Sequence, residues 1–169
     1  MVMLVTMLAL VESVGCPKCD RCMRISDDGR SATVNVCRME SDARFVDSFD
    51  LSGFPCGQRK SVQANNSVDG HALTVGGVTY QHGFGTRPES AVAFTANGGP
   101  LSFTARVAID DDAAKAGSGK SYGQPMATFA VWADGKVVWR SGLLKVGAEP
   151  KAVHVDLEGA EEIVLESTT

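Results

Sequence analysis

The stretch YQHGFGTRPES, residues 80–90, brings together residue types that can do chemistry. His82 can donate or accept a hydrogen bond, Arg87 presents planar donors, and Thr86 adds a hydroxyl. The two glycines between them allow the chain to turn sharply out of a strand. Four interpretations are open at this point: a phosphate cradle, half of a catalytic site, a sugar-binding rim, or a structural corner.

The sequence argues against the first two interpretations. A phosphate-binding G-x-G motif needs a third glycine that opens a helix, whereas RPES and another apolar alternation follow here. Ser90, His82 and Asp110 can be combined on paper into a serine-type site, but no nucleophile elbow supports them. We therefore predict no catalytic residue, and the sugar rim and the structural corner both remain open.

Two acidic segments could bind a cation or a sugar. Asn66 and Asp69, in NNSVDG, offer the hard oxygen ligands that Ca²⁺ prefers, with a plain Asx-type turn as the alternative. The run IDDD, ending at Asp112, could supply paired carboxylates, with a solvated strand end as the stronger alternative. We keep Asp110 as a candidate ligand contact, and Asn66 with Asp69 as a candidate calcium site.

Aromatic rings could form the other half of a sugar site, because the apolar face of a hexose stacks on a ring. Trp132 and Trp139 lie on a hairpin predicted around Asp134-Gly135. The pattern places Trp132 and Trp139 together on the face opposite to Val131. Both faces are apolar, so core packing is the stronger interpretation, and Trp139 is kept as a candidate sugar contact.

All five cysteines lie in the first third of the chain. Zinc held by Cys16, Cys19, Cys22 and Cys37 is conceivable because tetrahedral thiolate sites tolerate varied spacing. However, CPKCDRC lacks the second C-x-x-C of a zinc ribbon and the fourth ligand of an iron–sulfur run. Disulfides in an oxidising compartment or cysteines in a linker are the alternatives. The incomplete spacing speaks against zinc.

Length and composition are those of one globular domain with room for a short appendage. The chain has 169 residues, of which 44% are hydrophobic and 21% charged, which argues against disorder. A net charge of −4 without a Lys/Arg block offers no footprint for nucleic acid. We expect no nucleic-acid partner.

The first residues, MVMLVTMLALVESVG, contain an apolar run that is too short to span a bilayer. Ser13 and Gly15 suit a signal-peptidase site before Cys16, so we predict a signal peptide over residues 1–15. No Lys or Arg precedes the run and Glu12 lies close to the cut, so an ordinary strand or helix is the alternative. Residues 16–44 then form a cysteine-containing segment with a hairpin around Asp28-Gly29.

From Phe45 onward the chain reads as short strands between turns. Residues 101–109 alternate cleanly, with Phe103 and Val107 on one face and Thr104 on the other, which a helix cannot produce. Gly76-Gly77 and Asp69-Gly70 suit tight reversals. Seven or eight antiparallel strands at this spacing predict an all-β fold, an antiparallel β-sandwich or jelly roll.

Residues 45–169 also resemble a known family, the NPCBM domains found beside glycoside hydrolases. The resemblance runs through SVDGHALTVGGVTYQHGFGTRPES, FTARVAIDDD, FAVWADGKVVWRSGLL and AVHVDLEGAEEIVL, in the order of the family. It implies a galactose-binding-like β-sandwich that binds glycans, galactose-type sugars among them, through loops at one end. It also implies a catalytic glycosidase domain in the same protein, which would be secreted, at the cell surface or periplasmic, and related sandwiches often hold a structural Ca²⁺.

Three departures from the family stand out. Arg87-Pro88 replaces the usual His-Ala, the loop over residues 113–125 is longer, and the family continues with a further strand beyond Thr169. A missing strand would expose a sheet edge.

The function expected from the sequence is a non-catalytic carbohydrate-binding module, with ligand contacts from His82, Thr86, Arg87, Asp110 and Trp139. A ligand-free accessory domain of a glycosidase is the alternative. A metal-binding or protein-interaction module led by the cysteine segment is a third hypothesis.

Overall fold

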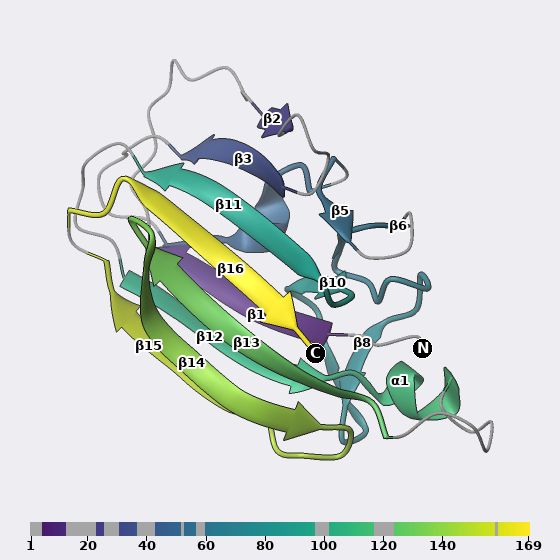
Figure 1. Cartoon of the computed structure of the whole chain (residues 1–169). Helices are drawn as coiled ribbons and strands as arrows, with labels where there is room; N and C mark the ends of the chain where they lie inside the picture. The colour runs from purple at the N-terminus through teal and green to yellow at the C-terminus, as the bar shows by residue number, and fades with distance from the viewer. Residues whose placement is uncertain are drawn as a thin grey trace.

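Two sheets stacked face to face form a β-sandwich (Figure 1). The computed structural model describes residues 5–12, 23–25, 31–36, 43–51, 53–56, 60–96, 102–116, 124–157 and 159–169. All strand pairs in the two large sheets are antiparallel except one, between β11 (Ser90–Ala96) and β3 (Ser31–Val36). The predicted all-β antiparallel sandwich is confirmed.

Among the described residues, the first sheet has six strands. Its order is β15-β12-β1-β10-β7, and β4 pairs with β1 on the side of β10. The bounds are β15 (Lys151–Asp156), β12 (Ser102–Ile109), β1 (Val5–Glu12), β10 (Phe84–Thr86), β7 (Gln63–Ala64) and β4 (Ala43–Phe45).

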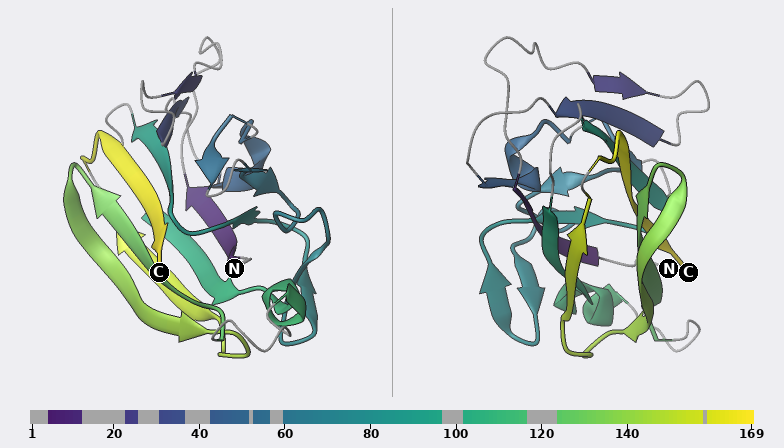
Figure 2. Two further views of the ribbon diagram at one scale, coloured as in Figure 1. Left: turned by 45° about the vertical axis from the view of Figure 1, so that its right-hand side comes forward. Right: turned by 90° about the vertical axis from the view of Figure 1, so that its left-hand side faces the viewer.

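The second sheet packs across the core from the first (Figure 2). Its order is β14-β13-β16-β11-β3-β2, with β14 (Lys136–Lys145), β13 (Met126–Ala133), β16 (Glu162–Thr168) and β2 (Met23–Ile25). Short elements complete the fold, namely η1 (Val46–Ser48), β5 (Pro55–Cys56), β6 (Lys60–Ser61), β8 (Leu73–Val75), β9 (Val78–Tyr80) and α1 (Asp111–Ala116).

Alternation along the strands builds the core. In β12, Phe103, Ala105 and Val107 are buried while Thr104 and Arg106 are exposed, as the period of two predicts. The largest fully buried side chains come from both sheets and from the segments that connect them, and they are Val46, Leu51, Phe54, Leu73, Phe84, Phe103, Ile109, Phe129 and Leu157. Burial of this apolar surface holds the two sheets together.

Two predicted hairpins are confirmed. Gly76-Gly77 joins β8 to β9, with Val75 opposite Val78. Asp134-Gly135 joins β13 to β14, and both turn residues have positive φ, 47° and 72°, as a two-residue hairpin turn requires.

The face predicted for Trp139 was wrong. A β-bulge lies between the pairs Val131↔Trp139 and Trp132↔Val137, so Val138 is the extra residue. Directly opposite residues share a face, which places Trp139 with the buried Val131, where it packs against the core. Val138 is 43% exposed instead.

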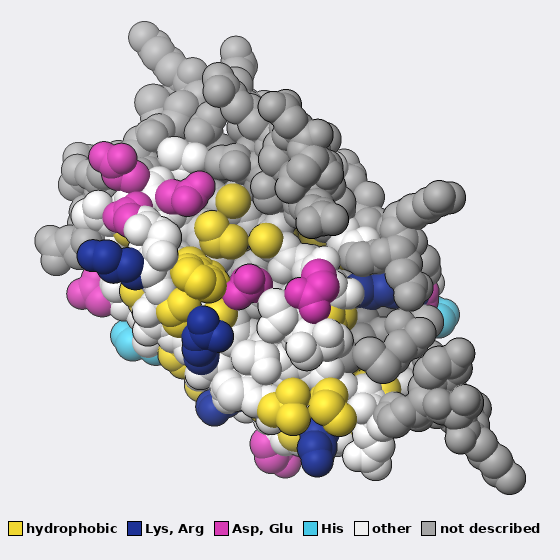
Figure 3. Space-filling view, viewed as in Figure 1, with side chains coloured by type: hydrophobic (Ala, Val, Ile, Leu, Met, Phe, Trp, Pro, Cys, Tyr) yellow, Lys and Arg dark blue, Asp and Glu magenta, His cyan; other side chains and the backbone are white. Residues whose placement is uncertain are grey.

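Trp132 follows the buried Val131 along β13, so it lies on the outer face of the second sheet. Its indole Nε1–H donates to Glu166 Oε2 over 2.9 Å, and the Arg140 guanidinium lies 5.8 Å from the ring centroid. Figure 3 shows apolar side chains interspersed with charged ones on this face.

The N-terminal predictions have different outcomes. Residues 5–12, within the predicted signal peptide, form β1 in the middle of the first sheet, and the signal peptide itself stays a prediction. β2 and β3 pair antiparallel on either side of Asp28-Gly29, although that turn lies outside the described residues. Cys16, Cys19, Cys22 and Cys37 also lie outside them.

Across the described part of the chain, no helix has the length and apolarity that crossing a membrane requires.

Candidate functional site

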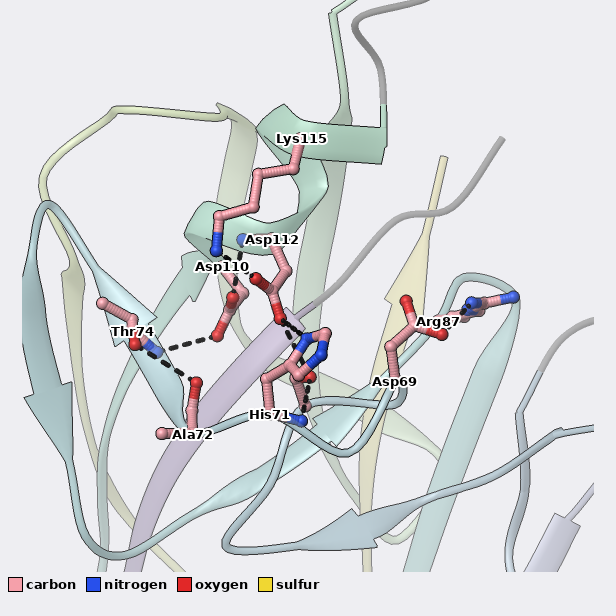
Figure 4. A network of polar contacts seen from close by, with 9 residues as sticks. Asp69, His71, Ala72, Thr74, Arg87, Asp110, Asp112 and Lys115 are labelled. Atoms are coloured by element: carbon pink, nitrogen blue, oxygen red, sulfur yellow. Dashed lines mark hydrogen bonds and ion pairs between the residues drawn. The ribbon is translucent and has the colours of Figure 1, made fainter.

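A cluster of polar side chains lies at one end of the sandwich, where β10 and β12 end (Figure 4). The loop over residues 65–72 and the β8–β9 hairpin approach α1 here. The contributing side chains are Ser67, Asp69, His71, Arg87, Asp110, Asp111, Asp112 and Lys115. We call these residues the loop-end cluster.

The loop over residues 65–72 is a compact turn. Ser67 N–H donates to the His71 carbonyl over 2.7 Å, and Gly70 N–H donates to the Ser67 carbonyl over 2.8 Å. Gly70 has φ of 86°, so the reversal predicted at Asp69-Gly70 is confirmed. The turn closes the loop so that the side chains of Ser67 and His71 both reach Asp112.

Asp110 begins α1 and fixes its position. The Asp110 carboxylate accepts the Asp112 backbone N–H over 2.9 Å, the usual bond of an N-cap aspartate. Its other oxygen accepts the Thr74 N–H from β8, also over 2.9 Å. Asp110 is fully buried. The predicted ligand residue therefore lies in the cluster, but its two carboxylate oxygens hold the backbone N–H groups of Asp112 and Thr74.

Asp111 ties the same helix to the β8–β9 turn. Its two carboxylate oxygens accept the Gly76 and Gly77 N–H groups, each over 2.9 Å. The segment from Asp111 to Ala116 is helical, although residues 113–116 belong to the loop that the sequence predicts over residues 113–125. The two acidic residues in its first turn complement the helix dipole.

Asp112 is the centre of the cluster. Its carboxylate accepts Ser67 Oγ–H over 3.2 Å, and lies 2.7 Å from both His71 Nδ1 and Lys115 Nζ. Burial acts to raise the pKa of Asp112, but the hydrogen bonds from Lys115 and His71 outweigh it and hold that pKa below its ordinary value. The Asp112 carboxylate in turn raises the pKa of Lys115.

Asp112 also orients the ring of His71. A carboxylate only accepts hydrogen bonds, so Nδ1 carries the proton, and in the neutral ring Nε2 is an acceptor. The His71 side chain is 68% exposed and that of Lys115 is 77% exposed, whereas Asp112 is only 10% exposed. A buried anion thus holds one exposed acceptor and one exposed cation in place.

Arg87 and Asp69 form the second part of the cluster. Arg87 Nη2 lies 2.9 Å from Asp69 Oδ1, and the two side chains are 7% and 29% exposed. Arg87 Nε is buried and has no hydrogen-bond partner. Such an orphan donor is rare in folded proteins and is a group that a bound oxygen would satisfy.

The structure does not bring all predicted ligand residues together. His82 precedes β10 and Arg87 follows it, so the two lie at opposite ends of that strand. His82 Nδ1 lies 3.1 Å from Asp47 Oδ2 instead. Thr86 is buried and its hydroxyl donates to Ser90 over 2.7 Å. Trp139, which packs against the core, has no contact with the cluster among those described.

The Arg87–Asp69 pair speaks against calcium at Asn66 and Asp69, and the calcium site stays a prediction. The Asp69 carboxylate is paired with the Arg87 guanidinium, and the Asn66 amide donates to the Ala64 carbonyl. A cation beside Asp69 would lie next to the positive charge of Arg87. In the part of the chain that the structure describes, His, Cys, Asp and Glu side chains form no group of three suited to a metal ion.

Sequence reasoning missed His71, Asp112 and Lys115 as a unit. His71 is separated from Asp112 by 41 positions, and only the topology brings them together. The signal that could have found His71 is its place directly after the Asp69-Gly70 reversal, where a side chain is projected from a tight turn.

A comparison with known protein families covers all residues of the loop-end cluster. A family model described as the NPCBM/NEW2 domain matches residues 43–169. The chain belongs to the NPCBM/NEW2 family. Every residue of the loop-end cluster lies inside the matched region of the NPCBM/NEW2 domain, and β1 lies outside it.

One curated relative matches part of the NPCBM/NEW2 domain. It is named "Putative endo-alpha-N-acetylgalactosaminidase", from Renibacterium salmoninarum, and is 35% identical over 97 residues. Those residues are 57% of this chain but 6% of the relative, so the chain spans a small part of that protein.

Solved structures share the fold. The CBM51 module from Clostridium perfringens GH95, in complex with methyl-galactose, is 22% identical with a TM-score of 0.61, covering 74% of this chain and 86% of that one. CBM51-2 with the INT domains from Clostridium perfringens ZmpB, in complex with GlcNAc, is 19% identical with a TM-score of 0.64, covering 86% and 32%.

Proposed function

We propose that this NPCBM/NEW2 domain is a non-catalytic module that binds galactose-type sugars at the loop-end cluster. The observation that carries the proposal is that a buried carboxylate, Asp112, holds His71 and Lys115 in fixed and exposed positions beside the Arg87–Asp69 pair. The CBM51 neighbour crystallised with methyl-galactose supports the choice of sugar class.

The polar groups suit a sugar hydroxyl pair. The exposed His71 Nε2 can accept a hydrogen bond from a hydroxyl, while Lys115 Nζ can donate one. The charged Lys115 forms a stronger hydrogen bond than a neutral donor would. Lys115 and His71 are both already held by Asp112, so little side-chain entropy is lost on binding.

The cluster does not support catalysis. Ser67 donates to Asp112 and the His71 ring also bonds Asp112, so no histidine nitrogen accepts the serine proton. The module would instead hold an attached catalytic domain near its glycan. The relative named after N-acetylgalactosaminidase activity supports a glycosidase as that domain, in a protein exported to the cell surface or beyond.

Affinity for one sugar is expected to be weak. A monosaccharide offers little apolar surface, and the cluster contributes polar groups rather than a stacking ring. Useful retention on a glycan would come from several modules or from the attached enzyme acting together.

His71→Ala tests this proposal directly. The chain has three histidines, so each can be changed in turn. Titration of the full chain with methyl-galactoside, followed by calorimetry or ligand-observed NMR, is expected to show about a tenfold loss of affinity in His71→Ala, the contribution of one hydrogen bond. Methyl-glucoside and GlcNAc serve as competing sugars.

His154→Ala is the matched control. His154 is exposed on β15 and bonds the Thr104 hydroxyl over 3.0 Å, so its loss should leave affinity unchanged. A larger loss in His82→Ala than in His71→Ala would move the site to the Asp47–His82 pair. Absence of sugar binding by a folded wild-type chain would favour the ligand-free accessory role.

A further inference from the structure

β1 lies outside the family-matched residues and yet at the centre of the first sheet. It pairs with β12 along its whole length, from Val5↔Ile109 to Glu12↔Ser102. On its other side it pairs with β10 from Val5↔Thr86 to Met7↔Phe84, and with β4 from Leu10↔Phe45 to Glu12↔Ala43. Figure 1 shows β1 between β12 and β10.

The family-matched strands leave a gap that β1 fills. β10 and β12 each pair with β1, and the described registers contain no pair between β10 and β12 themselves. β12 runs through the core, with Phe103, Ala105 and Val107 buried. Without β1, one row of its backbone N–H and C=O groups would lack partners, and buried groups of that kind are costly to leave unpaired.

The gap ends at the loop-end cluster. Val5 is opposite Ile109 on one side and opposite Thr86 on the other. The next residues along these two strands are Asp110, which caps α1, and Arg87, which pairs with Asp69. The first residues of β1 therefore set the spacing between the two strand ends that carry the cluster.

We propose that the gap between β10 and β12 is a strand-acceptor site, that Val5–Glu12 is its occupant, and that this occupancy assembles the loop-end cluster. The occupant is an extended antiparallel strand, and its sequence VTMLALVE carries no charge before Glu12. An uncharged run with β-branched ends suits a strand that is paired on both sides. The link to sugar binding rests on the proposed function, whereas the strand-acceptor site does not.

Removal of residues 1–15 as a signal peptide would take β1 away. The folded, sugar-binding protein cannot both keep β1 and be cleaved before Cys16. Mass spectrometry of the mature chain after export in a secreting host gives its first residue. A sugar-binding chain that starts at Cys16 would overturn the proposal.

Thr6→Pro in the full chain tests the pairing. Thr6 is opposite Ala108 of β12 and Gly85 of β10, so its N–H lies between two paired strands, and proline removes that donor. Hydrogen exchange of β10 and β12 amides is expected to become at least tenfold faster. Thr6→Val, which keeps the N–H and the β-branched shape, is the control and should exchange as the wild type does. Unchanged exchange in Thr6→Pro would overturn the proposal.

Peptide rescue separates a strand-acceptor site from simple misfolding. A synthetic peptide of residues 4–12, followed by two lysines for solubility, is added to Thr6→Pro during refolding. The peptide should restore protection of β10 and β12, and the same peptide with proline at position 6 should not. A misfolded variant that the peptide fails to rescue would count against the proposal.

Sugar titration of the same samples shows which part fails. Restored amide protection together with restored methyl-galactoside affinity supports both the strand-acceptor site and its link to the cluster. If protection is restored but the wild type itself binds no sugar, the proposed function fails and the strand-acceptor site stands. If the wild type binds sugar and Thr6→Pro binds it equally well, the link to the cluster is overturned.

Discussion

Gly85→Ala is expected to lower the free energy of unfolding by about 3 kcal/mol, the upper range for an overpacked core. A Cβ at this position would lie 2.5 Å from the Asn66 carbonyl oxygen, 2.8 Å from Ser67 Cα and 2.9 Å from Val68 N. All three are backbone atoms, so no side-chain rotation relieves the clash and the loop over residues 65–72 must shift. The shift would also pull Ser67 and His71 away from Asp112.

Gly142→Ala is the control for the Gly85 experiment. Gly142 has φ of 68° and no atom within 4 Å of the added Cβ, so only the left-handed backbone costs energy, about 1 kcal/mol. Urea denaturation followed by tryptophan fluorescence gives both values, and sugar titration should show lost affinity for the Gly85 variant alone. A cost for Gly85→Ala no larger than that for Gly142→Ala would mean that the loop does not pack on β10 as described.

Asp112→Asn is expected to cost about 2 kcal/mol of stability at pH 7, the usual price of weakening a buried charged hydrogen-bond centre. Asparagine keeps the shape but loses the charge that holds Lys115 and His71. Lys115 and His71 are largely exposed, so their ion pairs with Asp112 contribute little. Most of the loss therefore comes from the hydrogen bond of the buried Ser67 hydroxyl and from the burial of the Asp112 side chain. Urea midpoints of the two chains measure the difference.

The same carboxylate predicts a pH dependence. The folded pKa of Asp112 is lowered, so its contribution is present above the unfolded pKa, about 3.9, and is lost as pH falls through the folded value. The wild type should therefore lose stability below about pH 4 more steeply than Asp112→Asn, and the two should converge in acid. Glu149→Gln, at an exposed position before β15, should leave the pH profile of the wild type unchanged. A constant gap between wild type and Asp112→Asn across this range would contradict the account.

The fold could be predicted from local patterns because strand alternation and turn residues are local signals. Phe103, Ala105 and Val107 indicate the buried face of β12, and Asp134-Gly135 indicates the β13–β14 hairpin. The bulge at Val138 could not be predicted, because its place depends on how β13 and β14 pack on the core. That single extra residue moves Trp139 from the predicted face to the face that packs against the core, where it is half-buried.

The candidate site could be predicted only in part. Arg87, Asp69 and Asp110 were found from their residue types and neighbouring turns, and they lie in the cluster. The joining of His71 to Asp112 depends on long-range topology, which one sequence does not encode in any local spacing. Likewise, the apolar run at residues 5–12 satisfies both a signal sequence and a buried strand, since hydrophobicity is common to the two.

The central claim is that the loop-end cluster binds a galactose-type sugar. The most direct measurement is a titration of the isotope-labelled full chain with methyl-galactoside, recording every backbone amide by NMR. Shifts should concentrate in residues 66–74, at Arg87 and in residues 110–115, and should be absent from the outer face around Trp132. Shifts confined to that outer face or to the Asp47–His82 pair, or no shifts from a folded chain, would contradict the account.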